Sequence, residues 1–211
     1  DLTIVANGKI AFPEDSSKLF AFYRQGGCGP AVSNISLTEF NNSIDTSKVT
    51  DMSGMFGLNK SLILNLEAFD TSSVTDMNFM FYSSGATSLN LSNFDTSKVI
   101  NMSDMFYDSM ATEIKGLNKF NTSKVTNMSC MFCGSKAAAL DLSSFNTSSV
   151  TDMSGMFARS KVTTLDLSSF DTSKVTDMGG MFGYSAATTG YAKDAQTAAK
   201  FNDSSVTNIP D

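Results

Sequence analysis

"DTSKVTDMSGMF", residues 45–56, is repeated five more times along the chain with only a few changes. The later copies are DTSSVTDMNFMF from Asp70, DTSKVINMSDMF from Asp95, NTSKVTNMSCMF from Asn121, NTSSVTDMSGMF from Asn146 and DTSKVTDMGGMF from Asp171. A shorter seventh copy, NDSSVTNI, begins at Asn202. An apolar residue precedes each full copy and serves as position 1 of a unit: Ile44, Phe69, Phe94, Phe120, Phe145 and Phe170. A fixed period of about 25 residues is the signature of a repeat architecture.

Two apolar patterns recur within each unit. Positions 1, 6, 9, 12 and 13 are apolar in every copy, and most copies end in Leu-x-Leu, as at Leu165 and Leu167. The alternating Leu-x-Leu predicts a short strand with one buried face. The stretch Val-Thr-Asp-Met predicts a second extended piece, followed by a single helical turn that presents Met and Phe inward. Twelve of the thirteen methionines occupy positions 9 and 12, so we expect them to fill a core.

These patterns predict a repeat solenoid, because one unit cannot bury its apolar edge alone and must stack on the next. We expect a right-handed coil of the leucine-rich-repeat type, with parallel β-strands and short helical turns, formed by six units over 44–185. Residues 1–43 are expected to form an N-terminal cap, in which DSSKLFAFY at 15–23 echoes DTSKVTDMS and ISLTEF at 35–40 is a strand. Residues 186–211 should form a C-terminal cap with a helix at 192–201. The third unit contains one extra residue in IKGLNKF, which suggests a bulge.

Three polar positions are nearly constant and have a structural explanation. Asp or Asn at position 2 is followed by Thr-Ser in every copy, which predicts a side-chain hydrogen bond that fixes a turn. Asp or Asn at position 8 is expected to cap the following turn, and Asn or Ser at position 16 to satisfy loop backbone. Calcium binding by the acidic columns is the alternative. Asn replaces Asp freely and the glycine-rich spacing of calcium-binding repeats is missing, so we expect no metal site.

Composition argues against several classes of function. The net charge is −6 without any run of Lys or Arg, so we expect no nucleic-acid partner, and the apolar run SLILNL at 61–66 is too short for membrane insertion. The chain has no histidine, which removes the commonest general base and metal ligand. Cys130 and Cys133 form a C-x-x-C without further metal ligands, which favours two tolerated small residues or a local disulfide. Cys28 is expected to be unpaired with either.

An active site would show as a local break in the repetition that carries a nucleophile with a base or a pair of carboxylates. The breaks are Phe79, Asp104, the segment EIKGLNK at 113–119, the cysteine pair and Arg159. No such group is formed by these residues. We therefore expect no enzyme, no catalytic residue and no cofactor.

Partner binding requires surface positions at which the copies differ. One set is the outer row of the Leu-x-Leu strands: Asn65, Asn90, Lys115, Asp141 and Asp166. The other set follows each Met-Phe: Tyr82, Tyr107, Arg159 and Tyr184. Interface energy concentrates in Tyr and Arg, so the second set is the predicted binding site, although tyrosines that merely cover loop backbone remain an open interpretation. A different hypothesis uses the Thr column at position 3 as a flat hydroxyl array that binds ice or crystalline polysaccharide.

The repeated sentence, as in LDLSSFDTSKVTDMGGMF at 165–182, resembles the BspA-like leucine-rich-repeat surface proteins of bacteria. The resemblance covers about residues 35–185 and is closest to a subgroup long labelled a domain of unknown function in surface lipoproteins. It implies a leucine-rich-repeat solenoid in an extracellular, cell-surface location. It also implies adhesion to a host or bacterial surface protein or glycan, and it brings no catalytic residues.

Overall fold

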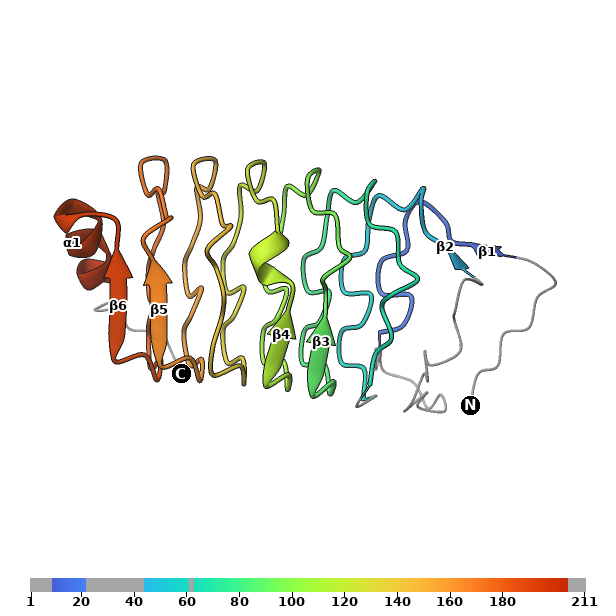
Figure 1. Ribbon diagram of the computed structural model, residues 1–211, viewed down its shortest axis with the longest axis horizontal. Helices are drawn as coiled ribbons and strands as arrows, with labels where there is room; N and C mark the ends of the chain where they lie inside the picture. Colours follow the sequence, from blue (N-terminus) through green and yellow to red (C-terminus); the bar gives the residue numbers. More distant parts are fainter. Residues whose placement is uncertain (1–8, 22–43, 61–62, 205–211) are drawn as a thin grey trace, which may run out of the picture.

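The computed structural model describes residues 9–21, 44–60 and 63–204. The described residues form short parallel strand pairs, many loops and one α-helix (Figure 1). β1 (Ile10–Ala11) pairs with β2 (Ile44–Asp45), β3 (Ser88–Asn90) with β4 (Glu113–Lys115), and β5 (Thr164–Leu167) with β6 (Thr189–Ala192). The 3-10 helix η1 (Leu117–Lys119) follows β4, and α1 (Ala195–Ser204) follows β6.

The repeated units lie side by side along the long axis of the molecule (Figure 1). Parallel bridges join the position-8 residues of successive units in one continuous ladder: Asp15, Asp51, Asp76, Asn101, Asn127, Asp152 and Asp177. The turn that follows continues this pattern, since the amides of Met52 and Phe56 donate to the carbonyls of Asp76 and Met80 at 3.0 and 2.9 Å. The backbone amides of each turn therefore donate to carbonyls of the unit one period later, which requires units of equal backbone geometry.

The core consists of identical side chains stacked between units. The position-13 phenylalanines form one stack with ring centroids 5.3–5.8 Å apart: Phe20, Phe56, Phe81, Phe106, Phe132, Phe157 and Phe182. Phe12 and Phe201 meet the two ends of this stack. Met128 and Phe132 are fully buried, as are their equivalents in the neighbouring units, which confirms the prediction that Met and Phe face inward.

The Thr column at position 3 lies in the interior, so the hypothesis of an exposed hydroxyl array is wrong for these residues. Thr46, Thr71, Thr96, Thr122, Thr147 and Thr172 are all at most 4 % exposed. The Thr122 hydroxyl donates to the Asn146 carbonyl at 2.9 Å and accepts from the Asn146 amide at 2.8 Å. The same pair of hydrogen bonds joins two units at five of the six threonines, all except Thr172.

The Asp and Asn columns make the turns that their spacing predicts. Asp45 Oδ1 accepts the Ser47 amide at 3.0 Å, and Asp51 Oδ1 accepts the Ser53 amide at 2.7 Å. Asn at the same positions accepts in the same way, as in Asn127 with the Ser129 amide at 2.8 Å. Asn serves as well as Asp because the turn itself uses only the acceptor oxygen. Three position-16 serines are buried and accept a loop amide two residues on at 3.4 Å: Ser84, Ser109 and Ser135.

The predicted helical turn after Val-Thr-Asp-Met is wrong. Residues 53–58 form consecutive tight turns, in which the Met55 amide donates to the Met52 carbonyl and the Gly57 amide to the Gly54 carbonyl. Positions 11 and 15 of each unit have a positive φ, as in Gly54 at 59° and Leu58 at 57°. A right-handed helix cannot contain such residues, and the chain therefore reverses direction within six residues.

The degenerate N-terminal copy is present but in another register than its echo suggests. Asp15 pairs with Asp51 at position 8, and Phe20 stacks on Phe56 at position 13. DSSKLF at 15–20 thus corresponds to DMSGMF at 51–56 rather than to DTSKVT. The inward Phe decides the alignment, because the stack needs a ring at that height. The predicted strand at 35–40 and Cys28 lie outside the described residues.

Two further expectations need correction. The extra residue of the third unit does not form a bulge within the strand but lies after β4. Gly116 has φ 91° there, and a Cβ on it would stand 2.6 Å from the Ser92 nitrogen, so only glycine fits before η1 begins. The C-terminal helix is confirmed but begins at Ala195 instead of 192. The preceding residues form β6, and Asp194 caps the helix by accepting the Thr197 amide at 2.7 Å.

Candidate binding edge

Positions 11, 14 and 15 of the units form one edge of the molecule, which we call the turn edge. Position 11 is Gly54, Phe79, Asp104, Cys130, Gly155 and Gly180 in order along the chain. Position 14 is Gly57, Tyr82, Tyr107, Cys133, Ala158 and Gly183, and position 15 is Leu58, Ser83, Asp108, Gly134, Arg159 and Tyr184. Backbone bonds hold these residues in line, since the amide at position 15 donates to the carbonyl at position 14 of the next unit, at 2.6 Å for Leu58 to Tyr82.

The backbone conformation of this edge favours glycine, yet the middle units do not use it. Phe79, Asp104 and Cys130 have φ values of 54°, 55° and 52°, in the left-handed region. This conformation costs a non-glycine residue roughly 1–2 kcal/mol. The neighbouring units place Gly54 and Gly155 at the equivalent position. At position 11, the middle units therefore carry side chains at a conformational cost that the glycines of the other units avoid.

Three aromatic side chains gather on this edge. Tyr82 and Tyr107 stack with centroids 5.2 Å apart and an interplanar angle of 25°, and Phe79 meets Tyr82 edge-on at 5.6 Å. Phe79 is 41 % exposed, whereas both tyrosines are half-buried. Burial is the main cause that raises the pKa of Tyr107 above its ordinary value. The sequence indicated the two tyrosines as a site but Phe79 only as a break in the repeat. The signal for Phe79 was a large ring at a position that elsewhere holds glycine.

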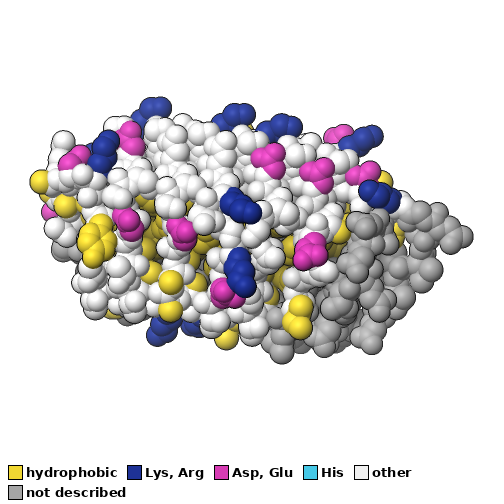
Figure 2. Space-filling model, viewed as in Figure 1, with side chains coloured by type: hydrophobic (Ala, Val, Ile, Leu, Met, Phe, Trp, Pro, Cys, Tyr) yellow, Lys and Arg dark blue, Asp and Glu magenta, His cyan; other side chains and the backbone are white. Residues whose placement is uncertain are grey.

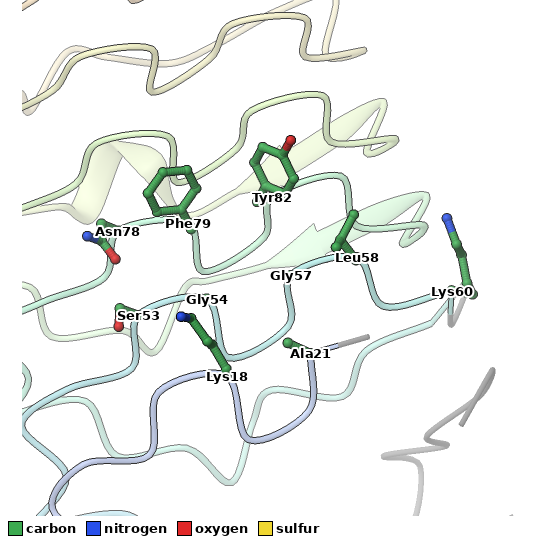
Figure 3. Close-up of a pocket in the computed structure, with 10 residues that line it drawn as sticks. All are labelled: Lys18, Ala21, Ser53, Gly54, Gly57, Leu58, Lys60, Asn78, Phe79 and Tyr82. Atoms are coloured by element: carbon green, nitrogen blue, oxygen red, sulfur yellow. The ribbon is translucent and has the colours of Figure 1, made fainter. Parts of the chain in front are cut away.

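A hollow of about 710 Å³ lies beside the aromatic side chains (Figure 3). Gly54 and Gly57 leave this space open, because they stand where the next unit has Phe79 and Tyr82. The ten residues that line the hollow are Lys18, Ala21, Ser53, Gly54, Gly57, Leu58, Lys60, Asn78, Phe79 and Tyr82. Its wall is thus aromatic and its floor is the glycine backbone, with two lysines among the remaining residues.

Arg159 and Tyr184 do not join this cluster. They belong to position 15 rather than 14 and lie two and three units beyond Tyr107. Arg159 is exposed with φ 54°, and Tyr184 is 71 % exposed with φ 53°. Gly155, Ala158, Gly180 and Gly183 surround them with small residues. The predicted set of four therefore divides into a packed pair, Tyr82 and Tyr107, and two separate exposed side chains.

The competing strand row faces outward, as its alternation predicts. In β3 and β4, the central residues Leu89 and Ile114 are buried and their neighbours exposed. The polar side chains of this row already serve the chain itself. Asn90 accepts the Ser92 amide at 3.2 Å, and Lys115 forms an ion pair with Glu113 at 3.5 Å. The face in Figure 2 shows acidic and basic side chains interspersed, without one large field of either sign.

The described residues contain no group of three or more His, Cys, Asp or Glu side chains that could hold a metal ion. Within the same part of the chain, no helix has the length and apolar character that a membrane crossing requires. What the turn edge offers chemically is aromatic surface, a hollow and a few cationic groups.

Equal units stacked along one axis define this molecule as a repeat protein. The side chains of its turn edge differ from unit to unit. The family model described as "Mycoplasma protein of unknown function, DUF285" matches residues 30–113 and again 109–210, and the chain belongs to this family. No curated protein and no solved structure shows significant similarity to the chain.

Proposed function

We propose that the chain is a non-catalytic binding module of the cell surface. In this proposal it is a right-handed leucine-rich-repeat solenoid of the BspA-like kind, and its turn edge adheres to a protein or glycan of a host or neighbouring cell. The stacked units with their parallel bridges support the solenoid, and the repeated sequence supports the surface location.

The aromatic cluster beside the hollow is the observation that carries the proposal. Tyrosine provides a large and rigid contact area at low entropic cost, and it is among the residues that dominate binding energy at interfaces. The cluster is preorganised, because Tyr82 is held between Phe79 and Tyr107. The two glycines beneath the hollow let a partner approach the backbone closely. A ring of a sugar or of an aromatic side chain can stack on such a wall.

Charge narrows the kind of partner. Lys18 and Lys60 line the hollow, and no carboxylate is among its described lining residues, although the whole chain has a net charge of −6. A partner with a negative group at the hollow would therefore gain attraction there while being repelled by much of the remaining surface. This combination selects orientation more than it adds affinity.

The test compares two pairs of substitutions in binding to a panel of immobilised glycans and extracellular matrix proteins. Y82S/Y107S removes the packed aromatic pair, and R159S/Y184S removes the separate exposed residues. We expect the first variant to lose at least about tenfold in affinity for any probe that the unchanged protein binds, because hot-spot aromatics each cost more than about 1 kcal/mol. The second variant should lose much less.

A matched control tests the strand row as the alternative binding site. N90A/K115A/D141A changes three polar side chains of that row, and circular dichroism and thermal melting of all variants verify that the fold is retained. Loss of binding only in the strand-row variant would place the site on the strands and contradict the proposal. Loss in R159S/Y184S alone would move the site to the far end of the turn edge.

A further inference from the structure

The two described cysteines occur together in the fourth unit, on the turn edge. Cys130 is at position 11 and Cys133 at position 14. The fifth unit has Gly155 and Ala158 at these positions, and neither position is cysteine in any other unit. A single unit has thus acquired both thiols, three residues apart, on a turn whose backbone favours glycine at the first of them.

The turn geometry brings the two residues within reach of a disulfide. The Cys133 amide donates to the Cys130 carbonyl at 3.0 Å, which closes a four-residue turn. The ends of such a turn lie within about 7 Å of each other, and a disulfide spans Cα atoms roughly 4.4–6.8 Å apart. Both thiols are free, and each side chain is the largest single influence on the pKa of the other. The two side chains therefore lie close together.

The neighbouring unit leaves room for the sulfur atoms. A Cβ added at Gly155 would lie 2.9 Å from Cys130 Sγ, so an alanine there would crowd the thiol. Cys130 is half-buried and Cys133 is 5 % exposed. Cys130 is therefore the more accessible residue of the pair, and a small reagent can reach it more readily than Cys133.

The local charges make the two thiols unequal. The interaction with Cys130 and, to a smaller extent, the guanidinium of Arg159 lower the pKa of Cys133 against the opposing effects of burial and of the Asp108 and Asp104 carboxylates. The same interaction, burial and the carboxylate of Asp104 raise the pKa of Cys130. A thiolate is the form that attacks a disulfide.

We propose that Cys130 and Cys133 form a redox-active dithiol, which closes reversibly to a disulfide by exchange with small disulfide molecules. One cysteine thiolate attacks a disulfide RSSR, forms a mixed disulfide and releases the first thiolate RS⁻. The second cysteine then attacks the protein sulfur of that mixed disulfide and expels the second RS⁻. The two protons of the original thiols end on the two RS⁻ groups. The protein pair is oxidised by two electrons, and RSSR is reduced to two RSH.

The experiment uses the full chain with Cys28→Ser, so that only the pair remains. This protein is equilibrated with mixtures of reduced and oxidised glutathione, free thiols are trapped with an alkylating reagent, and intact masses are read. We expect one transition from two alkylated cysteines to none, in a product that has lost two hydrogen atoms and carries no glutathione. Excess reductant should restore both thiols. C28S/C130S and C28S/C133S, each with one remaining thiol, should only form the glutathione adduct.

The result that overturns the proposal is a C28S protein that accumulates glutathione adducts like the two single-thiol variants. Persistence of both thiols in fully oxidised glutathione, where the single-thiol C28S/C133S variant does form the adduct, overturns it equally. The substitution G155A in the C28S background sharpens the test. It crowds Cys130 Sγ, and we expect it to slow closure at least about threefold while leaving the thermal transition of the reduced protein within a few degrees.

Discussion

The interior and the turn edge of this molecule follow opposite rules. In the interior, each column repeats one residue type: seven phenylalanines stack at position 13, and threonine occupies position 3 in every unit. On the turn edge, position 11 changes from glycine to Phe79, Asp104 and Cys130 within four units. The backbone of successive units is nevertheless the same in both regions, because equivalent hydrogen bonds recur from unit to unit.

The difference shows where such a molecule can vary. A stacked column needs equal side chains above and below, because a smaller residue leaves a void and a larger one forces the units apart. Turn-edge side chains project from the stack, so their variation costs local backbone strain and, for a half-buried charge such as Asp104, the loss of solvation. The stability of the chain should therefore depend on the columns, and its recognition on the edge.

Phe132→Ala should have the largest effect of the substitutions that test whether stability depends on the columns and recognition on the edge. It opens a void in the middle of the phenylalanine stack, between rings 5.3 and 5.8 Å away. Truncation of a core phenylalanine costs about 3–5 kcal/mol of unfolding free energy. Phe79→Ala on the turn edge is the control, with an expected cost below about 1 kcal/mol. Urea denaturation of both variants measures the two costs.

Similar losses of unfolding free energy in Phe132→Ala and Phe79→Ala would contradict the proposed difference between the interior and the turn edge. That result would mean that the edge contributes to stability as the interior does, and that the aromatic cluster serves the fold. It would thereby favour the interpretation in which the tyrosines of the edge merely cover loop backbone.

Thr122→Val tests the columns without changing their shape. Valine fills the space of threonine but leaves the Asn146 amide and carbonyl without the hydroxyl that now bonds both. An unsatisfied buried backbone group costs about 1–3 kcal/mol. Thr126→Val is the matched control, since Thr126 is exposed and its hydroxyl reaches the Ile100 carbonyl only at 3.4 Å. Its unfolding free energy should change by no more than about 0.5 kcal/mol. Equal losses in both variants would show that the buried column has no special role.

Periodicity made most of the interior predictable. Apolar positions 1, 6, 9, 12 and 13 recur without exception, and a period that repeats six times leaves little choice about which residues face inward. The turns at positions 2 and 8 were equally predictable, because Asp and Asn followed by Ser hydrogen-bond their own backbone. The alternative hypothesis that placed the Thr column on the surface was wrong, since a hydroxyl side chain alone does not reveal that its partners lie in the next unit.

The turn edge was less predictable because its conformation is hidden by non-glycine residues. Gly54 and Gly155 indicate a left-handed position, but Phe79, Asp104 and Cys130 in the same column conceal it. The left-handed position of the N-terminal copy was hidden in the same way, because the residue there is Lys18, with φ 56°, instead of glycine. Comparison of all copies at position 11 would have revealed the shared turn. The hollow beside Tyr82 could not be foreseen, as it arises from the absence of side chains at Gly54 and Gly57.

Apart from the controls, Asp104→Asn should have the smallest effect on stability of the substitutions considered. It is also the most specific test, because the change in stability depends on pH. Burial, together with the charge of Asp152, raises the pKa of Asp104 from 3.8 to about 6. The folded state therefore favours the protonated carboxyl, whose contribution is complete below the unfolded pKa and is lost as the pH rises through 6. At pH 7 the ionised Asp104 destabilises the fold, and asparagine should add about 1 kcal/mol after allowance for solvent screening.

Thermal melting from pH 3 to pH 8 checks this pH dependence against a matched variant. The advantage of Asp104→Asn should be near zero at pH 3 and should grow between about pH 4 and pH 6.5. Asp95→Asn should behave in the opposite way. Hydrogen bonds from Ser97 lower the pKa of Asp95, so the ionised form stabilises the fold, and this stability is lost as the pH falls through the folded pKa. If both variants respond to pH in the same direction, general charge repulsion governs the edge. If the stability changes of the two variants depend on pH in opposite directions, the cost of Asp104 at position 11 comes from the burial of its own carboxylate. The contrast between interior and edge requires this result.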